Sequence, residues 1–167
     1  MRFLGSHFNK AFKVVIEHEG GFVDDPTDRG KATNWGISQR AYPEVDVRNL
    51  TLKQAKIIYR DDYYDKFYDK LSEEIAIELF DTGVNMGVRV AKEFLQKAMN
   101  LMNRNEKNFD DLEVDGILGK RTLAAYNKVN KKALLKVLNG LQFSYYVSIV
   151  ENDKTQERYF NGWITRS

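Results

Sequence analysis

Apolar residues recur at helical spacing along most of the chain, and this pattern constrains the fold more than any other feature. In the first segment the spaced residues are Phe8, Ala11, Phe12, Val15 and Ile16. The same spacing returns in residues 75–80, 91–102 and 133–150. The exception is 22–38, which holds Pro26 and Gly30 among short polar residues and ends in β-forming ones. We therefore predict a mainly α fold with a short β-hairpin or loop after the first helix.

Local capping signals mark where several of these helices begin. Ser6 precedes the first apolar face, and Ser72 precedes the segment that contains residues 75–80. Thr51 and Gln54 have the spacing of a capping box, which predicts a helix through Tyr59. At 167 residues, with no repeat or linker, the chain is expected to form one globular body.

The residue types present exclude several classes of chemistry. The chain has no cysteine, which rules out disulfides, thiolate zinc sites and cysteine nucleophiles. Its two histidines, His7 and His18, make a histidine-rich catalytic zinc site improbable, and no G-x-S-x-G motif occurs. We expect no metal and no cofactor, so any chemistry should rest on carboxylates.

Charge and hydropathy bound the partners. The net charge of +2 is too small to imply nucleic acid, and no apolar run approaches the length of a membrane span. Residues 116–140 nevertheless hold six cations and no acid. Such a run is usually a solvated helix face. The alternative is a patch that contacts an anionic polymer such as cell-wall material.

The stretch Glu17-His18-Glu19-Gly20-Gly21 ends the first helix, and a helical wheel separates its two glutamates. With about 100° per residue, Glu19 falls within the apolar face, whereas Glu17 lies on the opposite side. Burial and the negative end of the helix dipole both favour the protonated acid at Glu19. Such a group can donate a proton near neutral pH. The alternative is a glutamate whose head reaches solvent or pairs with a cation.

The stretch EHEGGFVDDPTDRGKATNWGIS resembles the opening motif of glycoside hydrolase family 108, the muramidases of phages and bacteria. The matching residues are Glu19, Gly20, Gly21, Phe22, Val23, Pro26, Asp28, Gly30, Thr33, Gly36 and Ile37. Arg29-Gly30-Lys31 departs from the family's usual Pro-Gly-Gly turn. In the wider phage-lysozyme pattern, Thr33 comes one residue early after Asp28.

Further motifs extend the resemblance over nearly the whole chain. Tyr63-Tyr64 and the helix bearing Asp81, Asn85 and Gly87 resemble later family segments. VDGILGKRT and RYFNGWITR resemble its peptidoglycan-binding segment. The resemblance implies a lysozyme-like catalytic segment at 1–90 and a helical peptidoglycan-binding-like segment at 91–167, packed into the same body.

The resemblance implies cleavage of the β-1,4 bond between N-acetylmuramic acid and N-acetylglucosamine. Glu19 is then the general acid, Asp28 supplies negative charge and Thr33 helps to position water. Asp24 and Asp25 are alternatives for the second carboxylate, although a solvated turn is the preferred interpretation of both. A calcium loop built on these aspartates does not fit the EF-hand pattern.

Sugar sites use aromatic faces and amides, for which Trp35, Tyr63, Tyr64 and Asn85 are candidates. Packing in the core is the alternative for the aromatic residues, and a structural tie between loops is the alternative for Asn85. Trp163 is expected in the core or in docking the C-terminus.

Two other functions stay open: a lytic transglycosylase on the same bond, and a non-catalytic wall-binding protein. We expect a monomeric endolysin whose partner is bacterial peptidoglycan, with no nucleic acid and no stable membrane association. The start of the chain lacks a secretory pattern. We therefore expect synthesis in the bacterial host cytoplasm, and action in the periplasm after release through a holin-like pore or another route.

Overall fold

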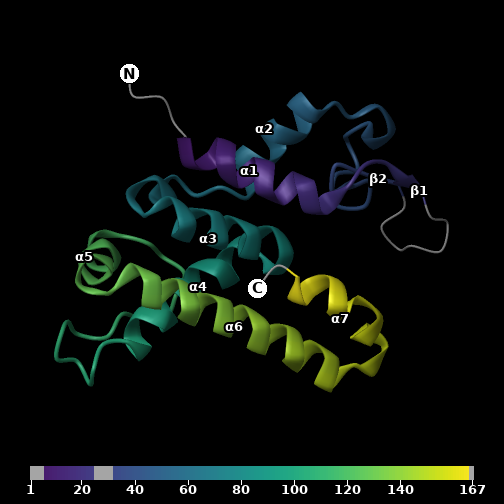
Figure 1. Cartoon of the computed structure of the whole chain (residues 1–167). Helices are drawn as coiled ribbons and strands as arrows, with labels where there is room; N and C mark the ends of the chain where they lie inside the picture. The colour runs from purple at the N-terminus through teal and green to yellow at the C-terminus, as the bar shows by residue number, and fades with distance from the viewer. Residues whose placement is uncertain (1–5, 25–31, 166–167) are drawn as a thin grey trace.

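A computed structural model describes residues 6–24 and 32–165 of the chain (Figure 1). Helices make up most of this structure, and a small sheet lies beside the end of the first helix. The α-helices are α1 (Ser6–Glu19), α2 (Leu52–Asp62), α3 (Glu73–Met86), α4 (Val88–Leu101), α5 (Lys120–Lys128), α6 (Lys131–Asn152) and α7 (Glu157–Ile164). Short 3-10 helices occupy Val47–Asn49, Lys66–Lys70 and Lys154–Gln156.

The predicted helix starts at residues 6, 51 and 72 are confirmed. The Thr51 side chain accepts a hydrogen bond from the Gln54 backbone, and the Gln54 side chain accepts one from the Thr51 backbone. This is the capping box expected from the sequence. Ser72 stands at the N-cap of α3 without a side-chain capping bond.

The expected hairpin is present as part of a three-stranded antiparallel sheet with the order β1-β2-β3. Its strands are β1 (Val23–Asp24), β2 (Ala32–Asn34) and β3 (Ile37–Ser38). Asn34 pairs with Ile37, so only Trp35 and Gly36 form the turn between β2 and β3. Their φ angles are 52° and 75°. Two positive φ angles are typical of the type I′ turn, whose twist suits a two-residue hairpin.

Helix α3 lies between two hydrophobic clusters and contributes to both. Phe80 of α3 packs with α1, α2 and the sheet in one cluster, where Phe12, Val15, Ile37 and Tyr59 are buried. Ile75 and Leu79 belong to the other cluster, with residues of α4, α5 and α6. Figure 1 shows α3 between α1 above it and α4 and α6 below it. The central position of α3 joins the two halves of the chain into one body.

The last helix, α7, was not predicted from the sequence. It packs on α6 through aromatic rings: Trp163 stacks on Tyr146 at 5.2 Å, and Phe160 lies 6.2 Å from Phe143. Trp163 therefore docks the C-terminal helix, one of the two roles expected for it. Within the described ranges, no helix is both long and apolar enough to cross a bilayer.

A group of polar side chains lies at the contact between α3 and α6. Gln142 of α6 is fully buried and donates a hydrogen bond to Thr82 Oγ1 at 3.2 Å. Glu78 lies one turn before Thr82. In the amide orientation that satisfies both groups, the Asn139 side-chain nitrogen donates to Glu78 Oε2 at 3.1 Å. Burial between the helices, followed by repulsion from Asp81, raises the pKa of Glu78 to about 7. The folded protein therefore holds the Glu78 proton more tightly than the unfolded chain does.

This geometry predicts that the fold loses stability as pH rises through the range in which Glu78 ionises. The pKa of Glu78 rises from 4.5 to about 7 on folding, so the folded state binds more protons between these values. The loss of stability should be about 3 kcal/mol, developing between pH 4.5 and 7 and complete above pH 7. Glu78→Gln should remove this loss, making the variant the more stable protein at pH 8.

Chemical denaturation at pH 5, 6, 7 and 8 measures this effect. Glu74→Gln is the matched control, because Glu74 is an exposed glutamate in the first turn of the same helix. Parallel stability profiles for the wild type and Glu78→Gln would contradict the prediction.

Candidate active site

Glu19 is the last residue of α1, and its burial separates it from the residues just before it. Glu17 and His18 are exposed, whereas Glu19 is partly buried. Gly20 follows with φ of +70°, a conformation that lets glycine end a helix. The helical wheel and the predicted glycine stop are both confirmed.

The Glu19 side chain lies against Gly36 in the turn between β2 and β3. A Cβ built on Gly36 would lie 2.9 Å from both Cγ and Oε2 of Glu19, and it would overlap the Tyr59 hydroxyl. The φ angle of Gly36 is also positive, at +75°. Both the backbone conformation and the space therefore require glycine at this position. Three segments far apart in sequence meet here: the end of α1, the hairpin turn and the end of α2.

Tyr59 holds this turn in place from the side of α2. It is 1% exposed, and its hydroxyl donates a hydrogen bond to the Trp35 carbonyl at 3.0 Å. The Tyr59 ring also packs edge-on against Phe12 of α1, with 5.6 Å between centroids. Sequence analysis did not single out Tyr59. Its position on the inner face of the helix predicted through Tyr59 was the one signal available.

Segment 47–50 fixes the turn from another direction. The Trp35 indole nitrogen donates to the Leu50 carbonyl at 3.1 Å. The buried Asn34 amide donates to the Val47 carbonyl at 3.1 Å and to the Leu50 carbonyl at 3.3 Å. Trp35 is held at a φ of 52°, which non-glycine residues rarely adopt, so these bonds maintain a strained conformation. The turn beside Glu19 is consequently a defined surface.

The structure places Thr33 in the sheet and gives Asp24 an ion-pair partner. Thr33 is the central residue of β2, partly buried, and pairs with Val23 and Ser38. Asp24 is exposed in β1 and forms an ion pair with Arg48. Asp28 and Asp25 lie outside the described residues.

The four candidate sugar-contacting residues do not form one group. Trp35 is beside Gly36 in the turn, and Tyr63 lies at the end of α2 with its ring 5.5 Å from that of Tyr59. Tyr64 instead packs at 5.2 Å against Phe8, near the other end of α1. Eleven residues separate Phe8 from Glu19, which is about 16 Å along a helix axis.

Asn85 is the fourth of these residues. It is exposed near the end of α3 and donates to the Asp81 backbone carbonyl at 2.9 Å and to the Asp81 carboxylate at 3.2 Å. In the part of the chain that the structure describes, no group of three or more histidine or acidic side chains could hold a metal ion.

Comparison with known proteins finds two family models that together span nearly all of the chain. Residues 12–87 match the model described as glycosyl hydrolase 108, and residues 89–167 match the one described as a predicted peptidoglycan domain. Among solved structures, the chain is similar to Brucella abortus SagA, with 29% sequence identity and a TM-score of 0.73. That match covers 95% of this chain and 88% of the SagA chain, and it confirms the predicted mainly α, lysozyme-like fold class. A search of curated proteins finds no match.

The close approach at Gly36 predicts that this glycine tolerates substitution less well than Gly20. Gly36→Ala should lower the free energy of unfolding by about 2 kcal/mol or more, because the new methyl group adds overlap to an unfavourable φ. Gly20→Ala is the matched control: its φ is also positive, but nothing lies within 4 Å of the new Cβ. Its cost should be about 1 kcal/mol.

Denaturant titration of both variants measures the difference. Equal losses would show that Glu19 and Tyr59 do not confine the turn. A larger loss for Gly36→Ala supports the packing described above.

Proposed function

We propose that the chain hydrolyses the β-1,4 bond between N-acetylmuramic acid and N-acetylglucosamine, because residues 12–87 match the glycosyl hydrolase 108 model. The family and the peptidoglycan domain identify the coarser activity, that of a glycoside hydrolase acting on peptidoglycan. The observation that carries the finer proposal is the position of Glu19, a carboxyl at a helix end held against a glycine turn. The turn at Gly36 and the Tyr59 hydroxyl fix the place of this carboxyl at the end of α1.

In the proposed reaction Glu19 is the general acid. Its carboxyl proton passes to the glycosidic oxygen as the bond from that oxygen to the anomeric carbon breaks. The oxygen of water then bonds to the anomeric carbon, and the water proton passes to a carboxylate. Proton transfer and leaving-group departure thus use one side chain, whereas charge stabilisation and water activation need a second group.

We propose Asp28 as the second carboxylate and Thr33 as the residue that positions water. The location of Thr33 supports this role, because Thr33 pairs in the sheet with Val23, which follows Glu19 by only four residues. The ion pair with Arg48 favours a structural role for Asp24. Asp28 rests on the family resemblance alone.

For the sugar rings, we propose Trp35 and Tyr63 as the nearer contacts, with Tyr64 and Asn85 as further ones. Trp35 adjoins the residue that Glu19 touches, and Tyr63 packs on Tyr59, which holds the turn. Tyr64 has its ring among Phe8, Tyr68 and Phe80, so core packing competes with a sugar contact there.

We further propose that residues 1–90 cut the glycan and that residues 91–167 hold the wall. The family matches to 12–87 and 89–167 support this division. A monomeric, endolysin-like protein made in the cytoplasm and released through a pore remains a prediction.

A lytic transglycosylase is the competing activity. It would use the same acid, but the C6 hydroxyl of the muramic acid would attack the anomeric carbon in place of water and form a 1,6-anhydro bridge. Thr33 in the sheet next to the helix end favours hydrolysis, because a hydroxyl there can orient a water molecule.

Replacing Glu19 should abolish lysis without unfolding the protein. Glu19→Gln removes the proton donor but keeps the side chain's shape, so turnover should fall roughly 10²- to 10⁴-fold. The measurement is turbidity loss of permeabilised Gram-negative cells. Glu17→Gln is the matched control, since it makes the same change two residues earlier on the exposed side of α1 and should keep full activity.

Circular dichroism of both variants establishes that they fold. Undiminished lysis by folded Glu19→Gln would remove this residue from the mechanism. Absence of lysis in the wild type as well would favour a non-catalytic wall-binding protein.

A further inference from the structure

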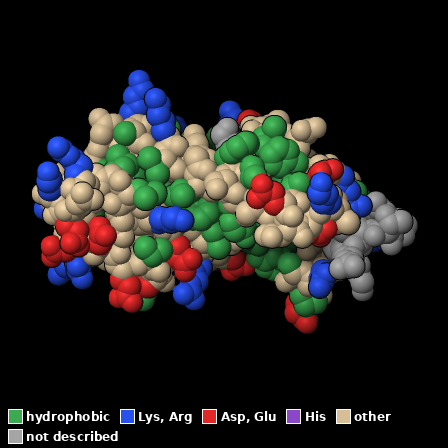
Figure 2. Space-filling view, turned by 90° about the horizontal axis from the view of Figure 1, so that it is seen from below, with side chains coloured by type: hydrophobic (Ala, Val, Ile, Leu, Met, Phe, Trp, Pro, Cys, Tyr) green, Lys and Arg blue, Asp and Glu red, His purple; other side chains and the backbone are tan. Residues whose placement is uncertain are grey.

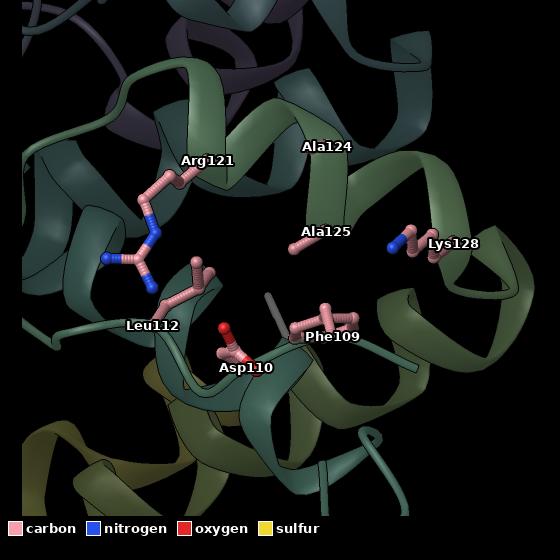
Figure 3. A pocket seen from close by; sticks show the side chains of 7 residues that line it. All are labelled: Phe109, Asp110, Leu112, Arg121, Ala124, Ala125 and Lys128. Atoms are coloured by element: carbon pink, nitrogen blue, oxygen red, sulfur yellow. The ribbon is translucent and has the colours of Figure 1, made fainter. Parts of the chain in front are cut away.

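A pocket distant in sequence from Glu19 opens between α5 and the segment that follows α4 (Figure 3). Its volume is about 310 Å³, at the small end of the range for ligand-binding clefts. The lining residues are Phe109, Asp110, Leu112, Arg121, Ala124, Ala125 and Lys128. Apolar and charged side chains are therefore combined in one small cleft, in the half of the chain that matches the peptidoglycan domain.

Amide side chains of α4 and of the residues just after it hold the segment that forms one wall of this pocket. Asn100 bonds through both amide atoms to the Leu112 backbone, at 2.7 and 2.8 Å. Asn103 is fully buried and accepts a bond from the Phe109 backbone nitrogen at 3.0 Å. At the end of the segment, the Gln96 side-chain oxygen accepts hydrogen bonds from the backbone nitrogens of Asp115 and Gly116. The wall is thus a fixed part of the fold.

The backbone of this segment also includes three consecutive residues in an unfavourable conformation. Arg104, Asn105 and Glu106 have φ angles of 58°, 56° and 59°. Three consecutive non-glycine residues in the left-handed region are unfavourable. Such a conformation persists where surrounding bonds enforce it. Here the Asp111 backbone nitrogen donates to the Glu106 carboxylate at 3.0 Å, which links this turn to the segment that lines the pocket.

Two cationic side chains of α5 lie across the pocket from this wall. Arg121 and Lys128 are seven residues apart, two helical turns, so they project from the same side of α5 about 10 Å from each other. Figure 3 shows them at opposite ends of the pocket, with Ala125 between them and Phe109 and Leu112 across from them. Lys128 is held there by a bond to the Asn108 carbonyl at 3.0 Å. The pocket therefore offers two positive charges flanking an apolar floor, with Asp110 as a single acid.

We propose that this pocket binds the peptide stem of peptidoglycan. A stem presents carboxylates spaced along a short chain, small alkyl side chains, and an ammonium group on its diamino acid. Arg121 and Lys128 match the carboxylates, Ala124, Ala125 and Leu112 match the alkyl groups, and Asp110 matches the ammonium. The glycan has no comparable charge, so stem recognition here would be separate from bond cleavage at Glu19.

Diffuse attraction by the cationic stretch 116–140 is the competing explanation. Figure 2 shows basic and acidic side chains mixed around a hydrophobic middle on the face that it presents, without one continuous basic field. Lys131, also in this stretch, is bonded to the Val129 carbonyl at 2.8 Å. These observations favour the defined pocket over a uniformly charged surface as the proposed binding site.

Cosedimentation with purified Gram-negative sacculi tests the proposal, using Glu19→Gln as background so that the polymer stays intact. Arg121→Gln with Lys128→Gln should weaken binding about tenfold or more, as expected for two charge-assisted contacts. Ala124→Trp should weaken it similarly by filling the pocket without changing charge. Lys132→Gln with Lys136→Gln is the matched control: it removes two exposed cations of α6 that do not line the pocket, and should change binding less than threefold.

The two products of complete amidase digestion provide the second arm as competitors: the released stem peptides should displace the background protein from intact sacculi, whereas the stem-free glycan strands should do so at least tenfold less well. Equal competition by the glycan strands, unchanged binding by the pocket variants, or an equal loss in the control pair would each overturn the proposal. This inference depends on the proposed function only in taking peptidoglycan as the partner. If the wild type does not cut glycan but the pocket variants still lose stem-dependent binding, the proposed hydrolysis is wrong and the proposed stem binding stands.

Discussion

The absence of a side chain at Gly36 determines how the candidate active site is assembled. The Tyr59 hydroxyl and the Glu19 side chain both occupy the space where a Cβ would stand. This lets a helix end, a hairpin turn and a second helix converge at one point. Tyr59 then bonds to the Trp35 carbonyl, so the turn that faces Glu19 is itself fixed by α2. The location of the carboxyl thus follows from packing among three segments.

Helix α3 extends this arrangement to the rest of the molecule. One side of it packs with α1 and α2, and the other with α4, α5 and α6. Its contact with α6 includes polar groups, and Glu78 there has a pKa raised to about 7 by burial. The proposed cutting and binding halves are therefore joined by a packed contact, and we expect its stability to fall as Glu78 ionises. A mobile linker is not needed to present the polymer to both halves.

Much of the fold could be predicted from the sequence, because apolar spacing and capping residues determine where several helices lie. The apolar spacing from Phe8 to Ile16 predicted both α1 and the inward position of Glu19, and Thr51 with Gln54 predicted the start of α2. Helix α7 was missed because its support is distant: its side chains stack on α6, and it has no side-chain capping bond. The contact of Tyr59 with Trp35 spans 24 residues, and the bonds of Asn100 to Leu112 depend on a loop conformation. No periodicity in the sequence encodes such contacts.

The central claim, that Glu19 drives hydrolysis by water, is tested most directly by digesting sacculi in water enriched in oxygen-18. Mass spectrometry of the released fragments then reports the fate of the anomeric carbon. Our account predicts one heavy oxygen at each new reducing end with wild-type protein, and no new ends with Glu19→Gln. Unlabelled 1,6-anhydro ends, or labelled ends made by Glu19→Gln, would contradict it.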